Sequence, residues 1–112
     1  MQPHIPALRR GKPYASLDRV DVKDCRTGEA LAQISQVNAG VIRKDLGKIS
    51  DARAALKRFS CDALIEICAK AARLFLEETL PLGDQGHSQS PDQYIETLSS
   101  TSGLPHVMVR RN

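Results

Sequence analysis

The stretch RVDVKDCRTGEALAQIS, residues Arg19–Ser35, indicates the fold most clearly. Val20 and Val22 alternate with charged neighbours, which is the two-residue period of a strand buried on one face. RTGE follows, and Gly28 can adopt the positive φ of a turn. ALAQIS then resumes an apolar pattern whose imperfect alternation allows a bulge or an early strand end. The stretch predicts a β-hairpin, and since two strands alone are marginal in water, this hairpin must lie on other structure.

The residues before this hairpin are rich in turn formers. Pro3, Pro6, Pro13 and Gly11 all fall within residues 1–16. This composition predicts an extended arm, in which ALRRGKPY can form a short strand that turns at Gly11-Lys12-Pro13. Residues 1–36 are therefore interpreted as an extended arm and a β-hairpin.

Three helices are predicted next. Asn38 is a helix N-cap before AGVIRKDL, and Gly47 is a natural stop. Ser50 is placed to cap DARAALKRF. Ser60 caps the longest helix, Ser60–Leu80, which runs until Pro81.

The Ser60–Leu80 helix is apolar over most of its circumference. Its polar residues form only a narrow stripe: Asp62, Glu66, Lys70, Arg73 and Glu77. A helix of this kind is buried on several sides and needs neighbours. We therefore expect it to pack inside a core larger than the short helices around it can supply.

The C-terminal part reads as a loop followed by two helices. Residues 82–90, LGDQGHSQS, are predicted as a polar loop. Ser90, Pro91 and Gln93 form the signature of a capping box that starts a helix ending at Gly103. HVMVRRN then begins a further helix. The predicted fold class is α+β, an N-terminal arm and hairpin followed by about four helices, with 37–112 as the helical segment and the whole as one incomplete domain.

Composition narrows the functional classes. Among 112 residues, 41% are hydrophobic and only 4% aromatic, with no Trp, so the core is expected to be aliphatic. No apolar run approaches the ~20 residues that span a bilayer, and the N-terminus lacks a signal-peptide pattern. Three Cys, an odd number, fit a reducing compartment. These features predict a cytoplasmic protein outside the membrane.

The basic residues are scattered in short clusters. The chain carries 16 Lys and Arg against 13 Asp and Glu, a net charge of +3. A nucleic-acid surface is usually a denser stripe, often with interleaved aromatics. The charges are therefore interpreted as solvated surface, and a nucleic-acid partner is not expected.

No complete catalytic motif is present. Cys61 and Cys68 would share a helix face about 10 Å apart, too far for a disulfide, and are interpreted as small core residues. Cys25, at the start of the hairpin turn, has no partner in the sequence pattern, and a reactive thiol there is the less favoured alternative. No G-x-G-x-x-G or Walker pattern occurs.

The histidines and hydroxyls complete the candidate chemistry. His4, His87 and His106 lack metal-ligand spacing, and a site role for His106 would need further chain. The hydroxyls of residues 99–102 lie in the last turn of a helix, so they are expected to bond back to helix carbonyls. No His or Asp is placed to activate them as nucleophiles. We therefore predict no catalytic, cofactor-binding or metal-binding residue.

The serial order of these parts resembles the N-terminal segment of the aldehyde dehydrogenase superfamily, over Leu8–Asn112. In that family an arm reading G-x-x-Y/W leads to a strand, a TGE turn, an A-R-x-A helix, a long helix and a helix ending near S-G-K-P. The matching residues are Gly11, Tyr14, Thr27, Gly28, Glu29, Leu31, Ala32, Ala52, Arg53, Ala54, Ala55, Gly103 and Pro105.

This chain departs from the common pattern in three places. Cys25 stands where Pro is usual, Leu104 replaces a usual Lys, and the connection SQVNAGVIRKDLGKIS is atypical. The departures make the chain more similar to an acyl-CoA-reductase-like branch.

The resemblance implies an NAD(P)-dependent oxidoreductase of aldehydes or acyl thioesters. In the family a Cys thiolate attacks the carbonyl and hydride passes to or from NAD or NADP. The nucleophilic Cys, the general-base Glu, the oxyanion Asn and the main cofactor-binding strands lie far downstream, so this segment would be scaffold, inactive alone and without a cofactor of its own. Its partner would be the remainder of the same polypeptide, and the full-length protein would be a homo-oligomer.

Two other interpretations remain open. In the first, the chain is a stand-alone helical interaction module that offers the Ser60–Leu80 helix to a protein partner. In the second, it binds nucleic acid weakly through two basic clusters, Arg9–Lys12 and Arg110–Arg111. The second is the least favoured of the three.

Overall fold

A three-stranded sheet organises the first third of the chain, in a computed structural model that describes all residues, Met1–Asn112. β4 (Arg19–Lys23) and β5 (Ala30–Ser35) form the predicted antiparallel hairpin, and β1 (His4–Ile5) runs parallel to the other edge of β5. The register shifts between Val22 and Lys23. One step on β4 spans two residues on β5, because Val22 pairs with Ala32 and Lys23 with Ala30, so Leu31 is the extra residue. The bulge that the imperfect alternation of ALAQIS allowed is therefore confirmed in that strand.

The RTGE turn is closed by its own polar groups. The Asp24 carboxylate accepts the backbone N–H groups of Arg26 and Thr27, at 2.7 and 3.1 Å. These two hydrogen bonds stabilise the charged form and lower the pKa of Asp24. Gly28 has φ +76°. The turn is thus a local structure built by Asp24 and Gly28, and the Cys25 N–H extends it by donating to the carbonyl of Ser100.

The N-terminal arm contains a second hairpin, β2 (Ala7–Arg9) and β3 (Lys12–Tyr14). Its two-residue turn is Arg10-Gly11, with φ of 51° and 78°. Positive φ at both positions matches the twist of the flanking strands. The predicted strand and turn are confirmed, but the turn lies one residue earlier, because Lys12 and Pro13 already belong to β3.

Two of the three predicted helix caps before residue 61 are confirmed. α1 (Ala39–Leu46) begins after Asn38, and α3 (Cys61–Glu77) begins after Ser60; each cap side chain accepts a backbone N–H three residues on. The Ser50 cap is wrong. α2 (Ile49–Leu56) starts one residue before it, because only two residues separate α2 from α1 and the chain re-enters helix at once.

The region after α3 differs most from the prediction. The predicted Ser60–Leu80 helix ends at Glu77. A hairpin of β6 (Leu80–Leu82) and β7 (His87–Gln89) then replaces the end of that helix and most of the predicted polar loop 82–90. Strands of three residues are too short to leave a periodic pattern, so they escaped detection. This hairpin reaches the N-terminal arm, which supplies the contacts that short strands need.

The C-terminal helices follow the prediction. α4 (Pro91–Ser102) has the complete Ser90 capping box and ends at Gly103 in the left-handed region. α5 (His106–Arg111) follows. The chain is therefore α+β, with five helices rather than about four. The predicted division of the chain at residue 36 stays a prediction.

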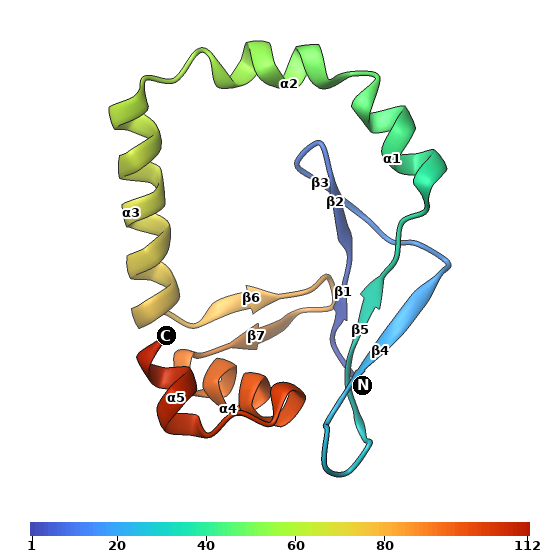
Figure 1. Cartoon of the computed structure of the whole chain (residues 1–112), viewed down its shortest axis with the longest axis vertical. Helices are drawn as coiled ribbons and strands as arrows, with labels where there is room; N and C mark the ends of the chain where they lie inside the picture. The colour runs from blue at the N-terminus through green and yellow to red at the C-terminus, as the bar shows by residue number, and fades with distance from the viewer.

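Helices α1, α2 and α3 form an arch that leaves the sheet and returns to it through β6 and β7 (Figure 1). The radius of gyration is 16.8 Å, against about 13 Å for a compact domain of this length. The accessible surface is 8774 Å², against about 6,100 Å² for a compact protein of this mass. The arch is the reason for both excesses.

Few side chains are buried as a result. The buried residues are His4, Ser16, Ala32, Ser35, Ile95, Ser99 and Val109. The prediction that the long helix is buried on several sides is wrong within this chain, since α3 has no buried residue. It contacts α4 near its end, where the Phe75 and Tyr94 rings meet edge to face at 4.8 Å.

Candidate functional site

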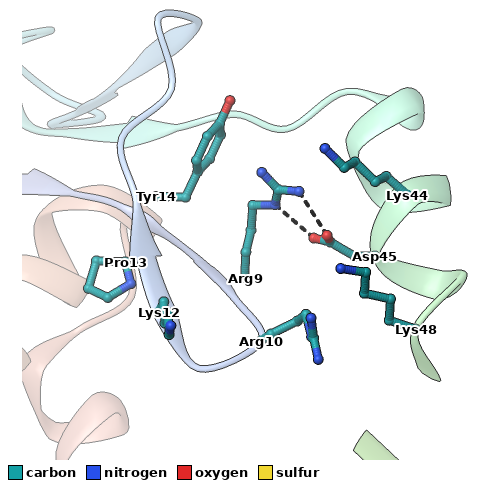
Figure 2. A pocket seen from close by; sticks show the side chains of 8 residues that line it. All are labelled: Arg9, Arg10, Lys12, Pro13, Tyr14, Lys44, Asp45 and Lys48. Atoms are coloured by element: carbon teal, nitrogen blue, oxygen red, sulfur yellow. Dashed lines mark hydrogen bonds and ion pairs between the residues drawn. The ribbon is translucent and has the colours of Figure 1, made fainter. Parts of the chain in front are cut away.

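A basic cavity of about 450 Å³ lies between the β2–β3 hairpin and α1 (Figure 2). Arg9 donates from Nε and Nη2 to the two carboxylate oxygens of Asp45, each at 2.8 Å. The Arg9 guanidinium carbon also lies 4.8 Å from the centroid of the Tyr14 ring. The hydrogen-bonded pair raises the pKa of Arg9 and lowers the pKa of Asp45.

This arrangement joins residues that the sequence separates. Its lining consists of Arg9, Arg10, Lys12, Pro13, Tyr14, Lys44, Asp45 and Lys48. The basic clusters around positions 10 and 44 were interpreted as scattered, but the Arg9–Asp45 contact brings them to one place. Arg110 is elsewhere, on α5, where it pairs with Asp92 at 2.9 Å.

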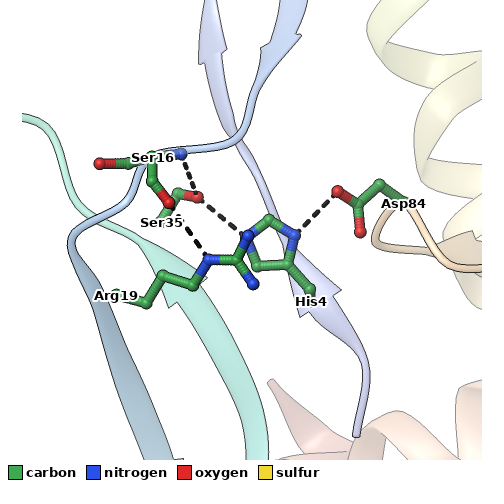
Figure 3. Close-up of polar contacts among 5 residues, drawn as sticks. All are labelled: His4, Ser16, Arg19, Ser35 and Asp84. Carbon is green, nitrogen blue, oxygen red and sulfur yellow. Dashed lines mark hydrogen bonds and ion pairs between the residues drawn. The ribbon is translucent and has the colours of Figure 1, made fainter. Parts of the chain in front are cut away.

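A second cluster is centred on His4, whose side chain is 2% exposed (Figure 3). Its Nδ1 lies 2.8 Å from Oδ2 of Asp84, and its Nε2 lies 2.9 Å from Oγ of Ser35. The backbone N–H of Ser16 donates to the same Oγ at 3.0 Å. The ring thereby joins β1, β5 and the turn between β6 and β7.

The His4 cluster has the composition of a hydrolytic triad, but its geometry is that of a structural contact. A nucleophilic serine must present its Oγ to a substrate carbonyl. Ser35 is buried, and its Oγ already accepts the Ser16 N–H. No substrate can reach it in this arrangement, so the cluster holds the sheet to the β6–β7 turn.

The backbone strengthens the same contact. The Asp84 N–H donates to the His4 carbonyl at 3.1 Å, and Gly83, at φ +72°, lies directly against that carbonyl. A Cβ at position 83 would overlap the His4 carbonyl oxygen. Sequence analysis missed this cluster because the partners of His4 lie 31 and 80 residues away, with no local signal.

The other candidate residues are dispersed. Cys25, Cys61 and Cys68 are all free and exposed, so the interpretation of the last two as core residues is wrong. They lie on α3, whose surface this chain does not cover. His87 is half-buried on β7, and His106 is exposed at the start of α5. No three His, Cys, Asp or Glu side chains are close enough together to hold a metal ion.

Two of the four hydroxyls at the end of α4 bond back to a helix carbonyl, as predicted, whereas that of Ser99 donates forward to a carbonyl beyond the helix. Ser99 donates to the carbonyl of Leu104 at 2.6 Å, while Thr101 and Ser102 donate to that of Leu98. The Ser99 contact closes the α4–α5 junction.

The largest unusual feature is an exposed apolar surface along α1–α3 and the short links between them. We call it the arch surface, and it comprises Ile42, Leu46, Ile49, Leu56, Phe59, Ile65, Ile67, Leu74, Phe75 and Leu76. Exposed apolar side chains are ordinary when they occur singly, but this many large ones on three successive helices are unusual for a monomeric soluble protein. Cavities of about 260 Å³ open at both ends of the arch surface, one against Leu8 and the other against Tyr94.

Comparison with known proteins adds no relative. A scan of protein-family models and searches of curated proteins and of solved structures found no match to this chain. None of the five helices is long and apolar enough to cross a membrane. The aldehyde dehydrogenase resemblance therefore rests on the sequence motifs alone.

Proposed function

We propose that this chain is the N-terminal scaffold portion of an NAD(P)-dependent aldehyde dehydrogenase-like oxidoreductase. The observation that carries this proposal is the uncovered arch surface. Ile65 and Leu76 are 66% and 69% exposed. Exposure of such apolar side chains to water is unfavourable, and covering them stabilises the protein. In the proposal, the remainder of the same polypeptide covers them.

The amount of exposed surface supports an extensive contact. The chain exposes about 2,700 Å² more than a compact protein of its mass would. Obligate interfaces bury about 2,000 to 5,000 Å² over both partners, which is about 1,000 to 2,500 Å² on each, and are strongly apolar. The excess therefore has the size of a permanent interface rather than of a transient encounter.

The proposal assigns no reacting group to this chain. The TGE turn and the β4–β5 hairpin would be architecture, consistent with the local hydrogen bonds that close the turn at Asp24. The thiolate nucleophile, the base and the nicotinamide site would belong to the covering part of the protein. As a cytoplasmic protein it would keep its three free thiols reduced.

The decisive experiment is to read the coding DNA beyond the codon for Asn112. The proposal expects the frame to continue for several hundred codons and to supply a Cys in a Gly-rich loop and a downstream Glu. Expression of that longer product should then protect amides of α3 from hydrogen exchange, compared with the 112-residue chain. A stop codon directly after Asn112, with no such frame nearby, would contradict it.

The interaction-module alternative is favoured by the same surface if the protein is the 112-residue chain alone. A module should melt cooperatively and form a monomer or a defined dimer. A scaffold portion should instead melt broadly and bind an apolar dye such as ANS. Calorimetry and light scattering on the purified chain separate the two.

A further inference from the structure

The basic cavity concentrates more positive charge than the whole chain carries. Its lining holds five cationic side chains and one carboxylate, a surplus of four, whereas the total surplus is three. The rest of the chain is therefore nearly balanced. A field of one sign focused into a hollow attracts ions of the opposite sign.

Three of the cations have no carboxylate partner. Arg9 is committed to Asp45, and Arg10 lies 3.7 Å from the carboxylate of Asp51. The ammonium groups of Lys12, Lys44 and Lys48 have no carboxylate within 4.0 Å, since no lysine forms an ion pair in this structure. Figure 2 shows the three lysines around the Arg9–Asp45 pair.

Helix electrostatics explain only part of this cluster. Lys44 lies in the last turn of α1, where the helix dipole favours a cation. Lys12 comes from β3 and Arg10 from the hairpin turn, and the dipole of α1 gives no reason for them to face the same cavity. The Arg9–Asp45 contact and the Tyr14 ring fix the floor between the two elements.

The shape selects a small ligand over a polymer. The cavity of about 450 Å³ lies within the range of small-molecule sites, which is about 300 to 1,000 Å³. Its uncharged lining is limited to Pro13 and Tyr14, so an apolar ligand has little to contact. The other basic pairs, Lys57–Arg58 and Arg110–Arg111, line no part of it, and no continuous stripe follows a nucleic-acid backbone.

We propose that the basic cavity between the β2–β3 hairpin and α1 binds a compact phosphate-bearing anion, of the inorganic diphosphate or nucleoside polyphosphate class. Lys12, Lys44 and Lys48 supply point charges to its phosphate oxygens, as ammonium groups do in other phosphate sites. Arg9 acts as a positioning residue that keeps α1 beside the hairpin. This site is independent of the scaffold proposal.

The test uses the 112-residue chain and inorganic diphosphate as the probe. Calorimetric titration should show one site, and the shifted amide signals in an NMR titration should map to β3 and the end of α1. The double substitution Lys44→Gln/Lys48→Gln should weaken the affinity at least about tenfold, because each charge-assisted hydrogen bond contributes substantially. Both side chains are exposed and unpaired, so the fold should tolerate the change.

Lys57→Gln/Arg58→Gln is the matched control, since it removes the same charge outside the cavity. Its affinity should stay within about twofold of the parent chain, apart from the general field effect. Equal weakening in both variants, or no diphosphate binding by the parent chain, would overturn the proposal. Tighter binding of a single-stranded oligonucleotide than of diphosphate or ATP would also overturn it, in favour of a nucleic-acid surface.

Discussion

The sheet around His4 and the arch of α1–α3 are held by opposite means. In the sheet, a buried histidine has both ring nitrogens within hydrogen-bond distance of partners, and a buried serine accepts a backbone N–H. In the arch, large apolar side chains face solvent without a cover. The polar groups of the sheet are satisfied within the chain, whereas the arch is held by local helix hydrogen bonds and a few contacts with other elements, such as Arg9–Asp45 and Phe75–Tyr94. Helices of this length are marginal on local hydrogen bonds alone, so the arch is the part of the chain with the least to stabilise it.

The largest expected loss of stability comes from Gly83→Ala, which disrupts the contact between the sheet and the β6–β7 turn. The new Cβ would overlap the His4 carbonyl and strain a residue at φ +72°. Strain and forced repacking together should cost about 2 to 5 kcal/mol. Urea unfolding followed by far-ultraviolet circular dichroism measures it.

Gly86→Ala in the same turn is the control for that substitution. Its φ is +75°, but nothing lies within 4 Å of an added Cβ. We expect only the cost of placing a Cβ in the left-handed backbone conformation, about 1 to 2 kcal/mol. Equal losses in the two variants would mean that the turn does not dock against His4.

His4→Ala should follow in size. It removes a buried ring and leaves Ser35 and Asp84 without a shared partner, at a cost of about 2 to 4 kcal/mol. Asp84→Asn keeps an acceptor for Nδ1 and should cost only about 1 kcal/mol, since a neutral hydrogen bond replaces a charge-assisted one. Chemical denaturation of the pair checks this order, and a larger loss for Asp84→Asn would contradict the arrangement in Figure 3.

Two isoleucines test the comparison directly. Ile95, on α4, is 8% exposed, and Ile65, on α3, is 66% exposed. Ile95→Ala should cost about 2 to 3 kcal/mol and Ile65→Ala less than about 0.5 kcal/mol in the isolated chain. A large loss for Ile65→Ala would show that α3 is covered, for example in an oligomer, and light scattering would then identify that state.

The smallest effect concerns the half-buried contact between Arg9 and Asp45. Because the pKa of Asp45 is lowered in the folded chain, its contribution is present above the ordinary value of 3.8 and is lost as pH falls through the lower folded pKa. Exchange of α1 amides, corrected for intrinsic rates, should therefore accelerate only in acid. Carboxyl ¹³C titration should show the Asp45 pKa returning towards its ordinary value in Arg9→Gln, and changing less in Arg10→Gln. If the Asp45 pKa changed equally in the two variants, the Arg9–Asp45 contact would be contradicted.

Sequence analysis was most accurate where the cause of the structure is local. Asn38 and Ser60 were identified as caps because a cap side chain bonds three residues away. The Ser90 capping box and the β4–β5 hairpin were found for the same reason. Ser50 failed because Ile49 follows α1 after only two residues, so a neighbouring helix took precedence over a good capping residue.

It was least accurate where distant residues meet. No residue close to His4 in the sequence indicates that its partners are Ser35 and Asp84. The strands of the β6–β7 hairpin are too short for a periodic pattern. The basic cavity was missed because Lys12 and Lys44 become neighbours only through the Arg9–Asp45 contact. α3 was recognised as apolar over most of its circumference, but its predicted burial was wrong, because composition does not say whether a cover is present in the same chain.

By itself, the sequence determined the β4–β5 turn, the starts of α1, α3 and α4, and the apolar character of the long helix, since each depends on residues a few positions apart. Only the tertiary structure decided that β1 pairs with β5, that His4 joins three elements, that five cations converge, and that the arch is uncovered. Those outcomes depend on contacts across 30 to 80 residues, whose closure is governed by the geometry of the whole chain rather than by any local preference.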